Sequence, residues 1–149
     1  MGDILKIRSS DWQRIGEKII KIIKDMTQLE GVDVNEKPFA KYSKSYRNKK
    51  VGNKFSRQSS RSSKPDLTLT GDTMGDLTLK EKSSRGVTIG WTAYGHIIDG
   101  QADQGRAVST DKKPVSDRVL KYMERQCIRV IEKNMSRASG NIVLKVGVK

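Results

Sequence analysis

The chain has 149 residues, of which 34% are hydrophobic, and its 30 Lys and Arg against 17 Asp and Glu give it a formal net charge of +13. This length predicts a single domain, and the low hydrophobic fraction limits the core that the chain can bury alone. The charge favours acidic or polyanionic partners. A single cysteine excludes an intrachain disulfide. Because no apolar run reaches about 18 residues, the sequence predicts neither a signal peptide nor a membrane-spanning helix.

The first predicted element is an amphipathic helix at residues 10–30. Its apolar side chains recur with the 3.6-residue period of one helix face: Trp12, Ile15, Ile19, Ile22, Ile23 and Met26. Lysines occupy many of the positions between them, as on a solvated face. Ser10 and Gln13 match the spacing of a capping box, and Gly31 is a natural stop because glycine adopts the left-handed conformation that ends many helices.

Residues 36–65 form a basic segment without any sustained periodicity. Ten Lys or Arg occupy positions 37–64, no acid lies among them, and serine is dense from Ser56 to Ser63. Such a composition cannot bury enough apolar area to offset the entropy of ordering the chain, so we predict a flexible loop. Its cations are our candidate contacts to a partner protein or to DNA: Lys41, Lys44, Arg47, Lys49, Lys50, Lys54, Arg57, Arg61 and Lys64.

Composition leaves three roles open for this basic segment. Its cations are interleaved with aromatic residues at Phe39, Tyr42, Tyr46 and Phe55. That combination suits nucleic acid, through phosphate neutralisation and base stacking. The same charge also suits docking onto an acidic protein surface, and a third role is only to keep a solvated loop soluble.

Residues 66–92 are predicted to be rich in β-structure. The sequence Asp-Leu-Thr-Leu occurs at 66–69 and again at 76–79, and a further alternation of apolar and small residues follows at 87–91. Two interpretations compete for the middle of this region. One is a hairpin of the two repeats, and the other is a strand in the first repeat followed by a short helical turn near Thr70.

The C-terminal part of the chain is predicted to hold a polar loop at 93–115, a helix at 116–134 capped by Ser116, and a half-buried strand at 141–148. One face of the helix collects Val119, Leu120, Met123, Cys127, Val130 and Ile131. The predicted fold class is therefore α+β. A small antiparallel sheet is packed by two amphipathic helices, with a long basic flexible loop, in a single domain over residues 1–149.

Nothing in the sequence indicates catalysis, a cofactor or a metal site. His96 is the sole histidine of the sequence, and Cys127 falls on the predicted core face. Nucleophilic and metal sites need several converging groups. Asp99 and Asp103 lie in a glycine-containing stretch but lack the ligand spacing of a calcium loop. We therefore predict that the protein is not an enzyme.

Short motifs follow one another in a particular order between the two predicted helices. They are Leu69-Thr70-Gly71, Met74, Ile89-Gly90 and Ala93-Tyr94. This series resembles that of the tail-completion, or virion-morphogenesis, neck proteins of tailed bacteriophages. The resemblance covers residues 10–148 in the order of their elements. At Thr70 and Gly71 it favours the short helical turn over the hairpin.

The resemblance implies a structural virion protein of the head-to-tail junction, as a neck connector, a tail-completion protein or a tail terminator. It implies a closed ring of identical subunits, a hexamer or a dodecamer. Such a ring contacts head-side connector and tail proteins, and genomic DNA in its channel. The protein would be located in the virion, and in the host cytoplasm during assembly, without membrane contact. The alternative, from composition, is a small basic nucleic-acid-binding protein.

Overall fold

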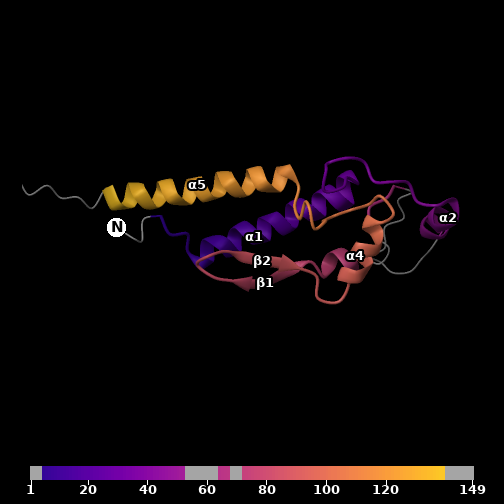
Figure 1. The fold of residues 1–149 in the computed structure, drawn as a ribbon, viewed down its shortest axis with the longest axis horizontal. Helices are drawn as coiled ribbons and strands as arrows, with labels where there is room; N and C mark the ends of the chain where they lie inside the picture. Colours follow the sequence, from indigo (N-terminus) through magenta and orange to yellow (C-terminus); the bar gives the residue numbers. More distant parts are fainter. Residues whose placement is uncertain (1–4, 53–63, 68–71, 140–149) are drawn as a thin grey trace, which may run out of the picture.

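The computed structural model describes residues 5–52, 64–67 and 72–139. Its elements are α1 (Ser9–Lys24), which continues into the π-helical turn η1 (Asp25–Glu30), then α2 (Lys44–Gly52), α3 (Asp72–Gly75), β1 (Thr78–Lys82), β2 (Val87–Gly90), α4 (Gly95–Ala102) and α5 (Asp117–Ser139). The predicted α+β class is confirmed, since a small antiparallel sheet packs against helices. Figure 1 shows α1 between α5 and the β1–β2 hairpin, with α4 and α2 beyond the end of the sheet.

Helix α1 with η1 occupies the predicted span, although its first turn differs from the prediction. The helix begins one residue before Ser10, and no side chain caps this end. The predicted capping box is therefore wrong. Instead, the side-chain amide oxygen of Gln13 accepts a hydrogen bond from Lys82 of β1 at 2.6 Å. Gly31 ends the last turn in the left-handed conformation, with φ of 69°, as predicted.

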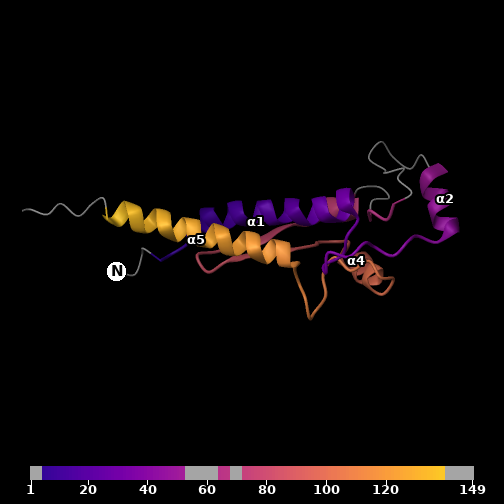
Figure 2. The same ribbon diagram turned by 90° about the horizontal axis from the view of Figure 1, so that it is seen from above.

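The predicted two-helix core is confirmed, but the placement of Leu120 on its face is wrong, since Leu120 is 43% exposed. Ile15 and Ile19 of α1 and Val119 of α5 form a buried cluster. Half-buried side chains complete it: Trp12, Ile22, Ile23, Ile89, Val115, Tyr122, Met123 and Cys127. A second buried cluster includes α3 and α4 residues: Phe39, Leu67, Met74, Leu77, Ile98 and Val108. Figure 2 shows α1 and α5 side by side along the long axis of the molecule.

The sheet is formed by the second Asp-Leu-Thr-Leu repeat and the alternating segment after it. Strand β1 pairs antiparallel with β2, and a register shift interrupts the ladder between Leu79 and Glu81. Helix α3 separates the two repeats, so the hairpin interpretation is wrong and the short helical turn is confirmed. Leu67, in the first repeat, has a left-handed φ of 51° and is not in a strand. Residues 68–69 and the strand predicted at 141–148 lie outside the described residues.

Two segments predicted as loops contain helices. Helix α2 lies within 36–65 and α4 lies within 93–115, and the loop prediction is wrong at both places. Each helix buries a single side chain, Lys50 in α2 and Ile98 in α4. Neither therefore carries the periodic apolar stripe by which a helix is recognised in a sequence.

Helix α5 begins where predicted and runs to Ser139. Ser116 caps it, because its Oγ accepts a hydrogen bond from the N–H of Val119 at 3.3 Å. The same hydroxyl donates to Sδ of Met26 at 3.4 Å. Arg118, in the first turn, pairs with Glu30 at 2.5 Å. These contacts fix the start of α5 against the end of η1.

A single carboxylate holds the loop that follows β2. Oδ2 of Asp76 accepts hydrogen bonds from the backbone N–H groups of Thr92, Ala93 and Tyr94 at 2.7, 2.8 and 3.0 Å. These bonds lower the pKa of Asp76 below its ordinary value because they favour the charged form, and the bond from Tyr94 has the largest effect. Asp76 thereby sets the path of the chain from the sheet into α4.

Replacing Asp76 with Ala should destabilise the fold at neutral pH, because three N–H groups lose their acceptor. A carboxyl whose pKa is lower in the folded state contributes stability above its unfolded pKa, and this stability is lost as the pH falls through the folded pKa. The difference in unfolding free energy between the wild type and Asp76→Ala, measured in urea, should therefore shrink below about pH 4. A difference that stays constant on acidification to about pH 3 would contradict this role.

The two-helix core predicts the outcome of two charge substitutions. Ile19 and Val130 are 4% and 7% exposed. An Asp at either position loses apolar burial worth about 1.5–3 kcal/mol and places a carboxylate without a partner in the core. We expect Ile19→Asp and Val130→Asp to unfold the domain or to abolish soluble expression, as measured by circular dichroism. Leu29→Asp is the control, since Leu29 is 76% exposed, and normal melting of both core variants would refute the packing.

A candidate basic contact surface at helix α2

Helix α2 lies at one end of the molecule, away from the two-helix core (Figures 1 and 2). Several of the predicted contact cations are exposed on this helix or next to it in the sequence or in space: Lys41, Lys44, Arg47, Lys49 and Lys64. Three others, Lys54, Arg57 and Arg61, lie outside the described residues. The structure thus brings the described, exposed cations of the basic segment to one end of the molecule.

Local sequence supports helix α2 even without an apolar stripe. Ser43 precedes the helix, and its Oγ accepts a hydrogen bond from the N–H of Tyr46 at 3.2 Å, as an N-terminal cap does. Lys and Arg have good helix propensity. Lys49 and Lys50, in the last turn, also complement the negative end of the helix dipole. Such local terms are small, so the helix also needs a tertiary contact.

Lys50 supplies that contact and is not a candidate for binding a partner. Its side chain is 0% exposed and forms an ion pair with Oδ1 of Asp66, whose side chain is 7% exposed. The prediction of an accessible cation at this position is therefore wrong. A lysine removed from water needs a charged partner, and Asp66 is the first acid after the basic segment. The pair joins α2 to residues 64–67.

Two cations approach the ring of Tyr42. Nζ of Lys50 lies 5.0 Å from the ring centre, and Cζ of Arg106 lies 5.1 Å from it, both within the range of a cation–π interaction. The Tyr42 hydroxyl accepts a hydrogen bond from the N–H of Leu67 at 3.1 Å. Burial raises the pKa of Tyr42 to about 12. The phenol is therefore neutral at physiological pH.

Arg106 connects this region to the end of α4. It is 5% exposed. Its guanidinium donates to the side-chain oxygen of Gln101 at 2.7 Å, to the carbonyl of Ala40 at 3.2 Å, and to the side-chain oxygen of Gln104. All three acceptors are neutral. Among the described residues, Arg106 forms no ion pair with an acid.

A hollow of about 400 Å³ opens beside Tyr42. We call it the basic cup, and its lining residues are Lys41, Tyr42, Lys44, Arg47, Lys64 and Pro65. Four of these six residues are cations and none is an acid. A concave surface that is lined by cations concentrates positive potential. The cup is therefore suited to an anionic group of a partner.

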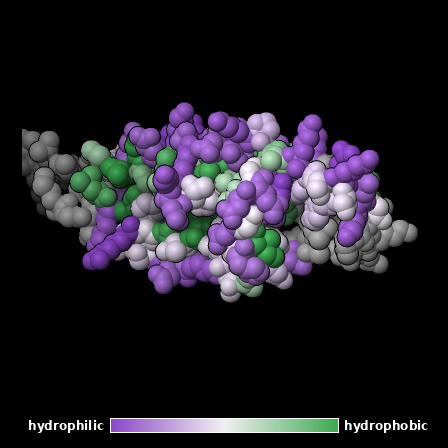
Figure 3. Space-filling model, turned by 45° about the vertical axis from the view of Figure 1, so that its right-hand side comes forward, coloured by the Kyte–Doolittle hydropathy of each residue, from purple (hydrophilic) through white to green (hydrophobic). Residues whose placement is uncertain are grey.

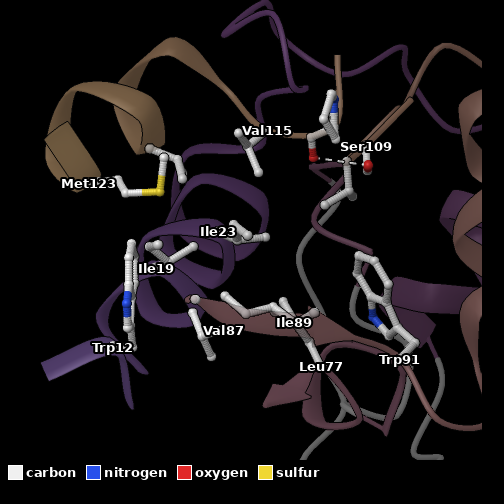
Figure 4. A pocket seen from close by; sticks show the side chains of 14 residues that line it. Trp12, Ile19, Ile23, Leu77, Val87, Ile89, Trp91, Ser109, Val115 and Met123 are labelled. Carbon is white, nitrogen blue, oxygen red and sulfur yellow. Dashed lines mark hydrogen bonds between the residues drawn. The ribbon is translucent and has the colours of Figure 1, made fainter. Parts of the chain in front are cut away.

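A second hollow, of about 410 Å³, lies over the core between α1, β2 and the start of α5 (Figure 4). Its walls are mostly aliphatic side chains, and none of the described side chains that line it is an acid or a base. Trp12 and Trp91 stand on opposite sides of it (Figure 4), and the indole N–H of each has no hydrogen-bond partner in the part of the chain that the structure describes. The one hydroxyl among the described residues that line it, that of Ser109, donates to the carbonyl of Pro114 at 3.0 Å, and no described acid or base lines the hollow beside it.

The remaining sequence candidates do not form a reactive site with one another. His96 is exposed on α4. Burial raises the pKa of the Cys127 thiol, so the thiol is protonated and a poor nucleophile. Within the described ranges, no three His, Cys, Asp or Glu side chains are grouped to hold a metal ion. None of the helices in those ranges combines the length and the apolar character needed to cross a membrane.

Comparison with protein-family models, with curated proteins and with solved structures finds no match. The functional interpretation therefore depends on the side chains themselves, and sequence reasoning missed two of them, Asp66 and Arg106. Asp66 had a signal, since it is the first acid after ten cations. Arg106 had none, because Ala40 and Tyr42 are distant in sequence and meet it only in the folded chain.

The buried ion pair predicts a strong non-additivity. Removing one partner leaves the other as an unpaired buried charge, so Lys50→Met and Asp66→Leu should each lower the free energy of unfolding by about 3–5 kcal/mol. The double variant should recover most of this loss in urea denaturation. Lys49→Met, at an exposed neighbour, is the control and should change stability by less than about 0.5 kcal/mol. If the two single losses simply add in the double variant, the residues do not act as a pair.

Proposed function

We propose that this protein is a structural component of the head-to-tail junction of a tailed bacteriophage, where identical copies form a ring. The observation that carries the proposal is a row of exposed apolar side chains on α5, a surface suited to contact between copies. The order of the sequence motifs, which resembles that of the phage neck and tail-completion proteins, supports the same function. The virion, and the host cytoplasm during assembly, would be its locations.

The apolar row on α5 consists of Leu120, Ile128 and Met135, which are 43%, 49% and 51% exposed. Their spacings are close to two helical turns, so they share one flank of the helix. Figure 3 shows hydrophobic surface toward the end of the molecule where the C-terminal half of α5 lies. Large apolar side chains gathered on one flank favour a contact with another protein surface.

The hairpin offers a second surface for self-association. In the part of the chain that the structure describes, β1 and β2 pair only with each other. The outer edge of each strand therefore presents backbone groups that a strand of a neighbouring subunit can pair with. A two-stranded sheet is marginally stable alone. Addition of strands from neighbouring copies would both stabilise the hairpin and build the ring.

Cyclic symmetry would repeat the α2 end of every subunit at one level of the ring. The basic cups would then form a circle of positive potential. Such a circle suits an acidic surface on the adjoining connector or tail protein, or the genomic DNA that passes through the channel. This gives the cations a function in joining layers, while the α5 row and the hairpin edges join copies.

Polar replacement of the apolar row should separate assembly from folding. We expect Leu120→Ser/Ile128→Ser/Met135→Ser to keep the circular dichroism spectrum of the wild type and to lose ring formation, measured by light scattering after gel filtration and by electron microscopy. A triple variant at exposed polar positions of the same helix, Lys121→Ser/Arg129→Ser/Glu132→Ser, is the control and should still assemble. A wild-type protein that is absent from purified phage particles by mass spectrometry would refute the proposal.

A further inference from the structure

Two hollows adjoin each other at Tyr42, whose side chain lines both. One is the basic cup. The other, of about 190 Å³, we call the tyrosine pocket, and its lining residues are Tyr42, Tyr46, Leu67, Thr73, Tyr94, Ile97, Ile98 and Gln101. Among the residues that the structure describes, none of those lining the tyrosine pocket is charged. The surface therefore places four cations directly beside an aromatic, uncharged pocket.

The basic cup has the composition of a phosphate site. Lys44 and Arg47 come from α2, Lys41 precedes the helix, and Lys64 comes from a different segment, so the cations approach the cup from two parts of the chain. The planar guanidinium of Arg matches phosphate oxygens in pairs, whereas Lys contributes compact positive charge. Contacts of this kind bind a nucleic-acid backbone by releasing its counterions.

The tyrosine pocket has the composition of a site for a nucleobase. The rings of Tyr42 and Tyr46 are 4.7 Å apart and tilted by 58°. Tyr46 and Ile97 are 37% and 36% exposed, so a ligand can reach the pocket from solvent. Burial raises the pKa of both Tyr42 and Tyr46, and the rings are thus uncharged and do not repel a phosphate nearby. The Gln101 amide adds a hydrogen-bonding group for a base edge.

Buried contacts hold the two hollows in place. The ion pair of Lys50 with Asp66 fixes α2 against residues 64–67, and the N–H of Leu67 donates to the Tyr42 hydroxyl. Arg106 lies against the same ring and adds a positive charge beside it. A site whose geometry is set before binding loses less entropy when the ligand arrives.

We propose that the basic cup and the tyrosine pocket together bind a nucleotide unit of single-stranded nucleic acid, with the phosphate in the cup and the base against the tyrosines. An unpaired base has a free π-face that can stack on an aromatic ring. A duplex keeps its bases stacked inside, so it can use the cup but not the pocket. An acidic peptide can likewise offer carboxylates to the cup alone. This site is independent of ring formation.

Fluorescence anisotropy of the full chain with a labelled oligo(dT), the matching duplex and poly-glutamate tests the proposal. We expect the single strand to bind more tightly than the duplex or poly-glutamate at equal salt. Lys44→Gln/Arg47→Gln should weaken this binding and lower the slope of log K against log salt by about 0.7, the value for one lost phosphate contact on a single strand. Lys18→Gln/Lys121→Gln removes the same charge from exposed positions of α1 and α5 and should keep the slope.

The tyrosine pocket is tested separately from the cup. Tyr46→Ala should weaken binding of the single strand by about 5- to 150-fold, the range for loss of one base–aromatic stack, and should leave duplex binding unchanged. Tyr46→Phe keeps the ring and should retain the wild-type affinity. Circular dichroism establishes that each variant is folded.

Three outcomes would overturn the proposal. Equal affinity for the single strand and the duplex, with no effect of Tyr46→Ala, would leave a general phosphate-binding surface. Preference for poly-glutamate would assign the cup to an acidic protein. Absence of binding to any of the three probes would leave the cations without this function. None of these outcomes depends on whether the protein is present in phage particles. That presence is the separate test of the proposed assembly function.

Discussion

The fold depends on helix α1, because both α5 and the two-stranded sheet pack against it. It contacts α5 on one side and both strands on the other. Ile23 of α1 and Ile89 of β2 contact both buried clusters, so the clusters form one continuous interior. Gly16 permits this arrangement, since a Cβ there would lie 2.6 Å from Cδ2 of Leu79 and 3.0 Å from Cγ2 of Val87. In a chain that is only 34% hydrophobic, one helix thus contributes to the core on two of its sides.

The parts of the fold that could be predicted are those in which burial and periodicity coincide. The stripe on α1, the end of its last turn at Gly31 and the cap of α5 at Ser116 follow from local patterns, and all are confirmed. Helices α2 and α4 could not be predicted in this way, because each buries one side chain and takes its stability from distant residues. The Ser10 cap was predicted from spacing alone and was wrong, since spacing does not fix the first residue of a helix.

The candidate site was predictable in its charge but not in its shape. Counting cations identified Lys41, Lys44 and Arg47, which are exposed, but the same count included Lys50, which is buried. Within a run of lysines, nothing in the local sequence indicates which side chain is buried in the fold. That depends on Asp66, sixteen residues away, and on the fold of the chain between them. The tyrosine pocket is less predictable still, because its residues come from four separate segments of the sequence.

Arg106 adds a buried positive charge to the end of the molecule that already holds the basic cup. Its guanidinium is buried among neutral acceptors and lies against Tyr42, which lines the basic cup together with four cations. Folding therefore gathers charges of one sign, and dissolved anions offset the repulsion among them. At the start of α5 the situation is reversed, since Arg118 attracts Glu30 and salt screens that attraction. Dissolved salt is therefore expected to stabilise the α2 end of the molecule and to weaken the contact between α5 and η1.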